Sequence, residues 1–138
     1  MASNEDIGCS GNGTFTQTGG ANTTTSLYLG VNGPADGTSP ASSGAYNMTG
    51  GSLVSVGGSA YSYQIVGYYG QGSFAQHGGS NTLGSTTLPV NLYIGYYDGS
   101  SGVYTMDATT STPTLTVTGS ENPWHKRKRG LWGDQWHF

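Results

Sequence analysis

Four residues spaced about thirty positions apart place a histidine between a hydroxyl group and a carboxylate. Thr18, Thr49, His77 and Asp107 each lie three residues past an aromatic residue of a repeated motif. If the repeats stack as strands of one sheet, neighbouring members of this column lie about 4.8 Å apart. Asp107 would then fix the tautomer of His77, His77 would act as the general base, and Thr49 would attack. The column therefore predicts a hydrolase of the esterase type.

The same column also has a purely structural interpretation. Its members have the opposite parity to the aromatic residues, so we expect them to face solvent. Threonine ladders are ordinary on outward strand positions, and threonine is a poor nucleophile without special activation. An exposed histidine beside an aspartate is also common. These arguments favour strand surface over catalysis.

Adjacent tyrosines form a second group of candidate residues. Their aromatic rings can present flat faces to sugar rings or to another protein. Because side chains alternate along a strand, we expect one ring of each adjacent pair to point inward and its neighbour outward. The outward rings would form a glycan-binding surface. The tyrosines concerned are Tyr68, Tyr69, Tyr96 and Tyr97, with a further pair at Tyr61 and Tyr63.

Other site chemistries find little support. A polysaccharide lyase needs a basic side chain, and residues 1–125 contain no Lys or Arg. A glycosidase needs two carboxylates about 5–9.5 Å apart, whereas the aspartates of the body, Asp36, Asp98 and Asp107, are not clustered. The three histidines and the single cysteine, Cys9, are too dispersed for metal-ligand spacing. We therefore expect no metal and no cofactor.

The candidate residues are positioned by an internal repeat. The segment 11–23 returns as 70–82, at an offset of 59, with eight of the thirteen positions identical. Weaker copies lie between and after these segments, so the period is about thirty in four units. The aromatic residues that mark the units are Phe15, Tyr46, Phe74 and Tyr104, at spacings of 31, 28 and 30.

Each unit contains two or three short alternating runs that end in turn-forming dipeptides, and no segment of the body has a 3.6-residue rhythm. Glycine, serine and threonine fill 60 of the 138 positions, and charged residues only 8%. The chain is therefore all-β. Segments 27–30, 64–67 and 92–95 close the first three units, and 53–56 and 114–118 supply middle strands.

A unit of this size cannot bury its few apolar side chains alone, so the units must stack. We expect a parallel β-helix, or β-solenoid, of about four coils with an irregular C-terminal tail. The four marker aromatics would form one interior ladder, with Gln17, Met48, Gln76 and Met106 beside it on the same face. An antiparallel sandwich of similar hairpins is the alternative.

The chain divides into three segments by composition. Residues 1–10 are an N-terminal extension, 11–120 the solenoid, and 121–138 a tail that contains all four basic residues (126–129) and all three tryptophans. Such a tail can contact an anionic membrane, but four charges without a supporting fold are a weak signal. We expect a capping or disordered segment and no nucleic acid partner.

The pattern Gly-x-Phe/Tyr-x-Gln/Met-x-Gly-Gly, followed by Leu-Tyr-Ile/Leu-Gly, resembles the autotransporter-associated β-strand repeats of large bacterial surface proteins. The resemblance covers about 11–118 and implies a right-handed parallel β-helix, secretion and adhesion. Members of that family usually carry many more units and a signal sequence, and this sequence shows no signal peptide.

We therefore expect a structural or adhesive module of a secreted or surface-displayed bacterial protein, located outside the cell or on its surface. Unpaired strand edges at the two ends of a short solenoid would make it prone to self-association. Polysaccharide is a further expected partner. A hydrolase and a glycan-binding module remain the alternative functions.

Overall fold

A computed structural model of the chain describes residues 3–33, 41–58, 62–122 and 136–137. In these ranges the strands form three parallel sheets, A, B and C. Sheet A contains β1 (Glu5–Ile7), β4 (Leu27–Leu29), β7 (Tyr63–Val66), β10 (Asn91–Ile94) and β13 (Glu121–Asn122). Sheet B contains β2 (Asn12–Gln17), β5 (Ser43–Met48), β8 (Gln71–Gln76), β11 (Ser101–Met106) and β14 (Trp136–His137). Sheet C contains β3 (Ala21–Thr24), β6 (Ser52–Ser55), β9 (Ser80–Leu83) and β12 (Thr114–Val117).

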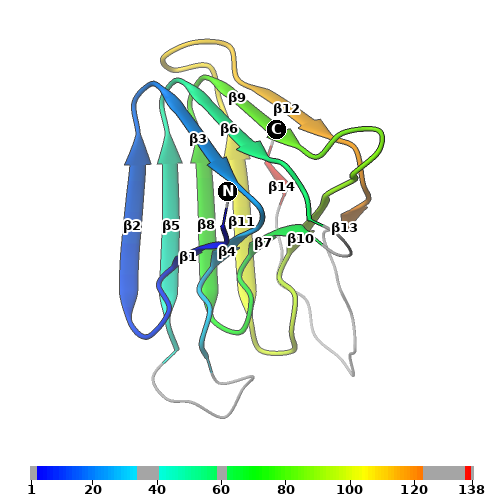
Figure 1. Cartoon of the computed structure of the whole chain (residues 1–138). Helices are drawn as coiled ribbons and strands as arrows, with labels where there is room; N and C mark the ends of the chain where they lie inside the picture. Colours follow the sequence, from blue (N-terminus) through cyan, green and yellow to red (C-terminus); the bar gives the residue numbers. More distant parts are fainter. Residues whose placement is uncertain (1–2, 34–40, 59–61, 123–135, 138) are drawn as a thin grey trace.

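The chain passes through sheets A, B and C in that order and then repeats the circuit. Coil 1 is β1 to β3, coil 2 is β4 to β6, coil 3 is β7 to β9, and coil 4 is β10 to β12. Figure 1 shows the long strands of sheet B side by side, each one coil apart. The predicted parallel β-solenoid of about four coils is confirmed. The antiparallel sandwich is wrong, because every pairing between the described strands is parallel.

The predicted aromatic ladder is present in sheet B. Phe15, Tyr46, Phe74 and Tyr104 are register partners on β2, β5, β8 and β11. The rings of Tyr46 and Phe74 are parallel with centroids 4.8 Å apart, and those of Phe74 and Tyr104 are parallel at 4.6 Å. Phe15 lies at the end of the ladder and stays 38% exposed. Constant spacing between coils is what makes this stacking possible.

The predicted interior column beside the ladder is also present. Gln17, Met48 and Gln76 are buried, and Met106 is partly buried against the core. This column alternates between an amide in coils 1 and 3 and a thioether in coils 2 and 4. Buried amides such as those of Gln17 and Gln76 require hydrogen-bond partners.

Backbone carbonyls accept from the amide nitrogens, and tyrosines of coil 2 and coil 4 donate to the amide oxygens. Tyr46 donates its hydroxyl to Oε1 of Gln17 at 2.6 Å and accepts from Nδ2 of Asn22 at 3.1 Å. Asn22 also donates to Oε2 of Glu5, at 2.8 Å. Burial raises the pKa of Tyr46 to about 12, with the Asn22 hydrogen bond acting in the opposite direction. The phenol therefore stays protonated and can donate.

The same relay recurs between coils 3 and 4, with its glutamine and asparagine 59 residues later and its tyrosine 58 residues later. Tyr104 donates to Oε1 of Gln76 at 2.7 Å and accepts from Nδ2 of Asn81 at 3.1 Å. Asn81 also donates to Oε1 of Gln64, at 2.9 Å. Within the described residues, every buried side-chain nitrogen and oxygen atom has a hydrogen-bond partner. Two coils joined by one relay are therefore the true structural repeat.

Sheets A and B approach each other closely along a column of glycines. Gly44, Gly72 and Gly102 are register partners on β5, β8 and β11. A Cβ atom on Gly72 would overlap the backbone of Val66 and Gly67 at the end of β7. The hydrogen atom of glycine is therefore the only side chain that fits this corner.

Strands of the solenoid also lie in residues 1–10 and 121–138, the two segments that we expected to flank it. Strand β1 lies in 1–10 and pairs with β4, and β13 lies in 121–138 and pairs with β10. Strand β14 pairs with β11, next to coil 4. The expectations for the basic run 126–129 fall outside the described residues. Across the described ranges there is no helix that is long and apolar enough to cross a membrane.

Replacing Gly72 with Ala should destabilise the fold by about 1–3 kcal/mol or more, because the new methyl group overpacks the corner between sheets A and B. The midpoint of urea unfolding measures this effect. Gly19→Ala is the matched control, since a Cβ at Gly19 meets nothing within 4 Å. Equal midpoints for the two variants would contradict the close approach of the sheets.

Candidate functional site

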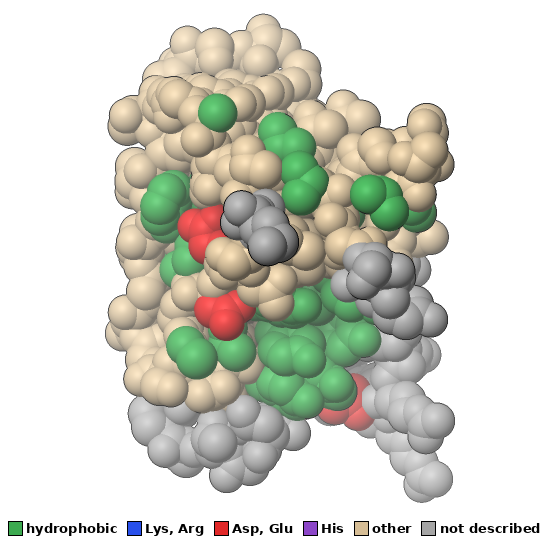
Figure 2. All heavy atoms as spheres, viewed as in Figure 1, with side chains coloured by type: hydrophobic (Ala, Val, Ile, Leu, Met, Phe, Trp, Pro, Cys, Tyr) green, Lys and Arg blue, Asp and Glu red, His purple; other side chains and the backbone are tan. Residues whose placement is uncertain are grey.

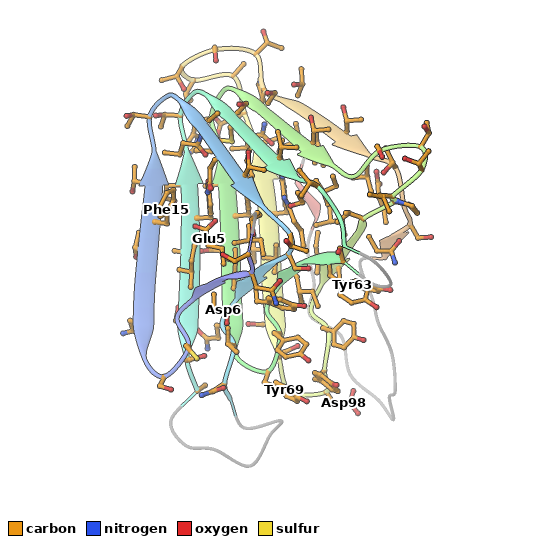
Figure 3. The ribbon with its side chains drawn as sticks, viewed as in Figure 1. Glu5, Asp6, Phe15, Tyr63, Tyr69 and Asp98 are labelled. Atoms are coloured by element: carbon orange, nitrogen blue, oxygen red, sulfur yellow. The ribbon has the colours of Figure 1, made fainter. Side chains whose placement is uncertain are left out.

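Seven tyrosines gather on the outer face of sheet A and on the loops that follow it. We call this group the tyrosine surface. The space-filling view shows a large hydrophobic area on this side of the molecule (Figure 2), and Figure 3 labels two members of the group, Tyr63 and Tyr69. The seven residues are Tyr28, Tyr63, Tyr68, Tyr69, Tyr93, Tyr96 and Tyr97.

Ring contacts connect all members of the tyrosine surface. Tyr69 and Tyr97 are parallel, with ring centroids 4.0 Å apart. Tyr68 lies at the centre, with centroid distances of 5.3 Å to Tyr28 and 5.3 Å to Tyr97. Edge-to-face and offset contacts of this kind add stability beyond the burial of area. The cluster is therefore held in shape by its own contacts.

The tyrosine surface also has an apolar floor. Ile65 lies on the outer face of β7, between its register partners Tyr28 on β4 and Tyr93 on β10. Although it points away from the solenoid interior, Ile65 is only 1% exposed. The tyrosines therefore form a small hydrophobic layer outside the main core, and the rings at its surface are supported from below.

The prediction that one ring of each adjacent pair points into the core is wrong. Tyr68, Tyr69 and Tyr96 are half-buried, Tyr97 is 39% exposed, and none of these rings belongs to the core. Alternation fails here because β7 and β10 end before these residues. Gly67 and Gly95 follow the strands with φ of 84° and 71°, a left-handed conformation that turns the chain. Both rings of each pair consequently stay outside.

Two members of the tyrosine surface, Tyr28 and Tyr93, were missed by reasoning from adjacent pairs. The Leu-Tyr-Ile/Leu-Gly motif could have predicted them, because its tyrosine directly follows a buried leucine and so has the opposite parity. That parity places both rings on the outer face of sheet A. Tyr61, the remaining tyrosine of the predicted pairs, lies outside the described residues.

The tyrosine surface is uncharged except at its margin. Burial raises the pKa of Tyr68, and the neighbouring Tyr97 acts in the same direction. Burial likewise raises the pKa of Tyr96. These phenols therefore stay neutral at physiological pH and can both donate and accept hydrogen bonds. Asp98 follows Tyr97 directly, is exposed, and lies beside the tyrosines in Figure 3.

The other candidate site brings His77 and Asp107 together. Both residues directly follow sheet B strands, β8 and β11, on consecutive coils. Nδ1 of His77 lies 2.8 Å from each carboxylate oxygen of Asp107. Because a carboxylate only accepts, Nδ1 must carry the proton, and Nε2 is then the basic nitrogen of the neutral ring. The side chains are 34% and 44% exposed, respectively, so the column faces solvent as expected.

Thr49 occupies the next position of this column but makes a different contact. Its Oγ1 lies 3.5 Å from the carbonyl oxygen of Gln17, on the preceding coil. The carbonyl of His77 accepts from Oγ1 of Thr110 at 2.6 Å and from the Thr110 backbone N–H at 3.0 Å. These contacts favour a role for His77 and Asp107 in joining coils 3 and 4. Attack by Thr49 stays a prediction.

Metal-ligating side chains do not converge in the described ranges: no three His, Cys, Asp or Glu residues there lie close enough to hold an ion. Cys9 is an exposed free thiol. Comparison with known proteins found no matching family model, curated protein or solved structure. The resemblance to autotransporter-associated repeats thus stays a prediction from the sequence.

Replacing Asp107 with Asn should lower stability at neutral pH. The hydrogen bond from His77, followed by that from Thr109, lowers the pKa of Asp107 below its ordinary value. A carboxyl group whose pKa is lower in the folded state stabilises the fold at pH values above its unfolded-state pKa of about 3.9. This contribution disappears as the pH falls through the lowered folded-state pKa.

Urea unfolding at pH 7 and at a series of acidic pH values measures this difference. The midpoints of the wild type and Asp107→Asn should differ at pH 7 and converge in strong acid. Asp98→Asn serves as the control, because Asp98 is an exposed turn aspartate. A difference in unfolding midpoint that is the same at every pH would show that the ionised carboxylate of Asp107 does not stabilise the fold through His77.

Proposed function

We propose that this chain is a structural and adhesive module of a secreted or surface-displayed bacterial protein, and that it adheres by binding uncharged polysaccharide. The observation that carries this proposal is the gathering of seven tyrosines on one side of the solenoid. A contiguous exposed aromatic area on an otherwise polar surface is typical of an interaction site. The repetitive β-solenoid supports the structural part of the proposal.

Tyrosine is suited to this task for physical reasons. Its ring offers a large apolar area with few rotatable bonds, so little conformational entropy is lost on binding. Its hydroxyl group can exchange hydrogen bonds with the hydroxyl groups of a sugar. The stacked pair Tyr69 and Tyr97, together with the central Tyr68, is already ordered by ring contacts. A ligand would therefore meet a preformed surface.

The charge distribution favours an uncharged ligand. The described residues include no Lys or Arg, since all four basic residues lie at 126–129. An acidic polymer would find no cation among the described tyrosines, and it would be repelled by Asp98. The carboxylate of Asp98 can instead accept hydrogen bonds from sugar hydroxyl groups. Neutral glucans and xylans are the first polymers to test.

Replacing Tyr97 with Ala should weaken binding to a neutral polysaccharide about tenfold, the size of a typical aromatic contact at an interface. Isothermal titration calorimetry with soluble xylan and hydroxyethyl cellulose measures the affinity. Val103→Ala is the matched control: Val103 is 40% exposed, Tyr97 39%, and Val103 lies on β11 of sheet B. The control should bind like the wild type.

Two results would overturn the proposal that the tyrosine surface binds neutral polysaccharide. One is a wild-type chain that binds none of the neutral polymers tested. The other is equal loss of affinity in the Tyr97 and Val103 variants, which would show that the tyrosine surface is not the binding site.

A further inference from the structure

Both glutamates of the sequence lie at the ends of one column of sheet A. The register partners across this sheet are Glu5, Leu27, Gln64, Leu92 and Glu121, one from each of β1, β4, β7, β10 and β13. The central position of the column is therefore a neutral amide, and the two terminal positions are carboxylates. Glu5 and Gln64 are separated by 59 residues, the period of the two-coil repeat.

Gln64 shows what this position does inside the solenoid. It is fully buried at the junction between coil 2 and coil 3. Its Nε2 donates to Oγ of Ser55 in coil 2 at 3.0 Å and to Oδ1 of Asn81 in coil 3 at 2.9 Å. Parallel stacking of Tyr46 on Phe74 completes the same junction. A neutral side chain at position 64 is thus compatible with a coil packed on either side.

The N-terminal face of coil 1 is a copy of the face that coil 3 buries against coil 2. Phe15 corresponds to Phe74, and Glu5 corresponds to Gln64. Phe74 has a stacked ring on each side, whereas Phe15 contacts Tyr46 alone among the described rings and is 38% exposed. The edges of β2 and β3 carry no further strand within the described residues. The N-terminal face of coil 1 should therefore pack on the C-terminal face of coil 2 or coil 4, as the N-terminal face of coil 3 packs on coil 2.

Coil 4 is such a coil, and the described strands that follow it pair with only part of its outer edge. Strand β14 pairs with β11 through two residues, and β13 pairs with β10 through two. The internal junction of β5 with β8 pairs six residues. Strand β2 of a second copy has six residues available for β11, so it can make the longer pairing and displace β14. Strand β1 of the same copy has three residues and takes the place of β13 beside β10.

We propose that the two end coils are docking faces for a second copy of this chain, which stacks head to tail in the pattern of the junction between coils 2 and 3. Glu5 restrains this association, because it would take the buried position that Gln64 has inside the solenoid, and burying a carboxylate without a cationic partner is costly. Inward-pointing charges at exposed edges are a known means of limiting strand-to-strand growth. This proposal concerns a different surface from the tyrosine surface and does not depend on polysaccharide binding.

The test is the full-length variant Glu5→Gln, studied by sedimentation equilibrium at pH 7. Glutamine retains the Oε1 acceptor that Gln64 offers to Asn81, so the relay to Asn22 can persist. The dissociation constant for self-association should fall on the order of 10-fold relative to the wild type, since one buried charge is removed.

A charge-matched control separates this effect from a change in net charge. The variant Asp98→Asn changes the formal net charge from −3 to −2 (−3 plus 1), as Glu5→Gln does. Asp98 is exposed and lies in the turn after β10, outside the column that contains Glu5. This control should associate like the wild type. Association equal to that of the glutamine variant would overturn the proposal.

Two further variants in the glutamine background locate the interface. Phe15→Lys places a charge on the exposed ring position of the N-terminal face and should abolish association. Trp136→Pro removes a backbone donor from β14 and should strengthen it. Unchanged association in the Phe15→Lys chain would place the contact elsewhere. A glutamine variant that stays monomeric both with and without Trp136→Pro would refute the docking of end coils.

Discussion

The physical constraint behind this structure is the stacking of parallel strands in register at a fixed separation. Each interior position of a coil lies directly against the same position of the next coil, so its side chain must be compatible with that neighbour. A buried amide needs a donor for its oxygen atom as well as acceptors for its nitrogen atom. This chain meets the constraint by alternation. Coils 1 and 3 contribute Gln and Asn, and coils 2 and 4 contribute the Tyr hydroxyl that bridges them.

The same constraint acts on the outer surface. Because the separation between coils is constant, equivalent outward residues lie one above the other, and two kinds of cluster result. Tyr69 stacks on Tyr97, and His77 contacts Asp107. The first cluster is extended, supported by Ile65 and nearly uncharged, and it therefore supports the proposed adhesion. The second is a single exposed pair, with contacts that favour the joining of neighbouring coils.

Much of the fold was predictable because the repeat itself carries the information. The spacings between Phe15, Tyr46, Phe74 and Tyr104 predicted the ladder, and the offset of 59 marked the two-coil unit. The contacts of the relay were not predictable, because a period does not show which side-chain atoms meet across sheets. The site was predictable only in part. Adjacent tyrosines in the sequence predicted a group of aromatic rings, but they did not predict the orientation of these rings, since alternation ends where Gly67 and Gly95 turn the chain.

By itself, the sequence determined the all-β class, the stacking of coils and the residues that form the interior ladder. These features follow from periodicity, which is local information that repeats along the chain. Only the tertiary structure decided how Glu5, Gln64 and Glu121 share one column, how seven tyrosines from three coils form one surface, and which hydroxyl satisfies each buried amide. Such relations depend on the distances between sheets A, B and C, and those distances are set when all coils pack together.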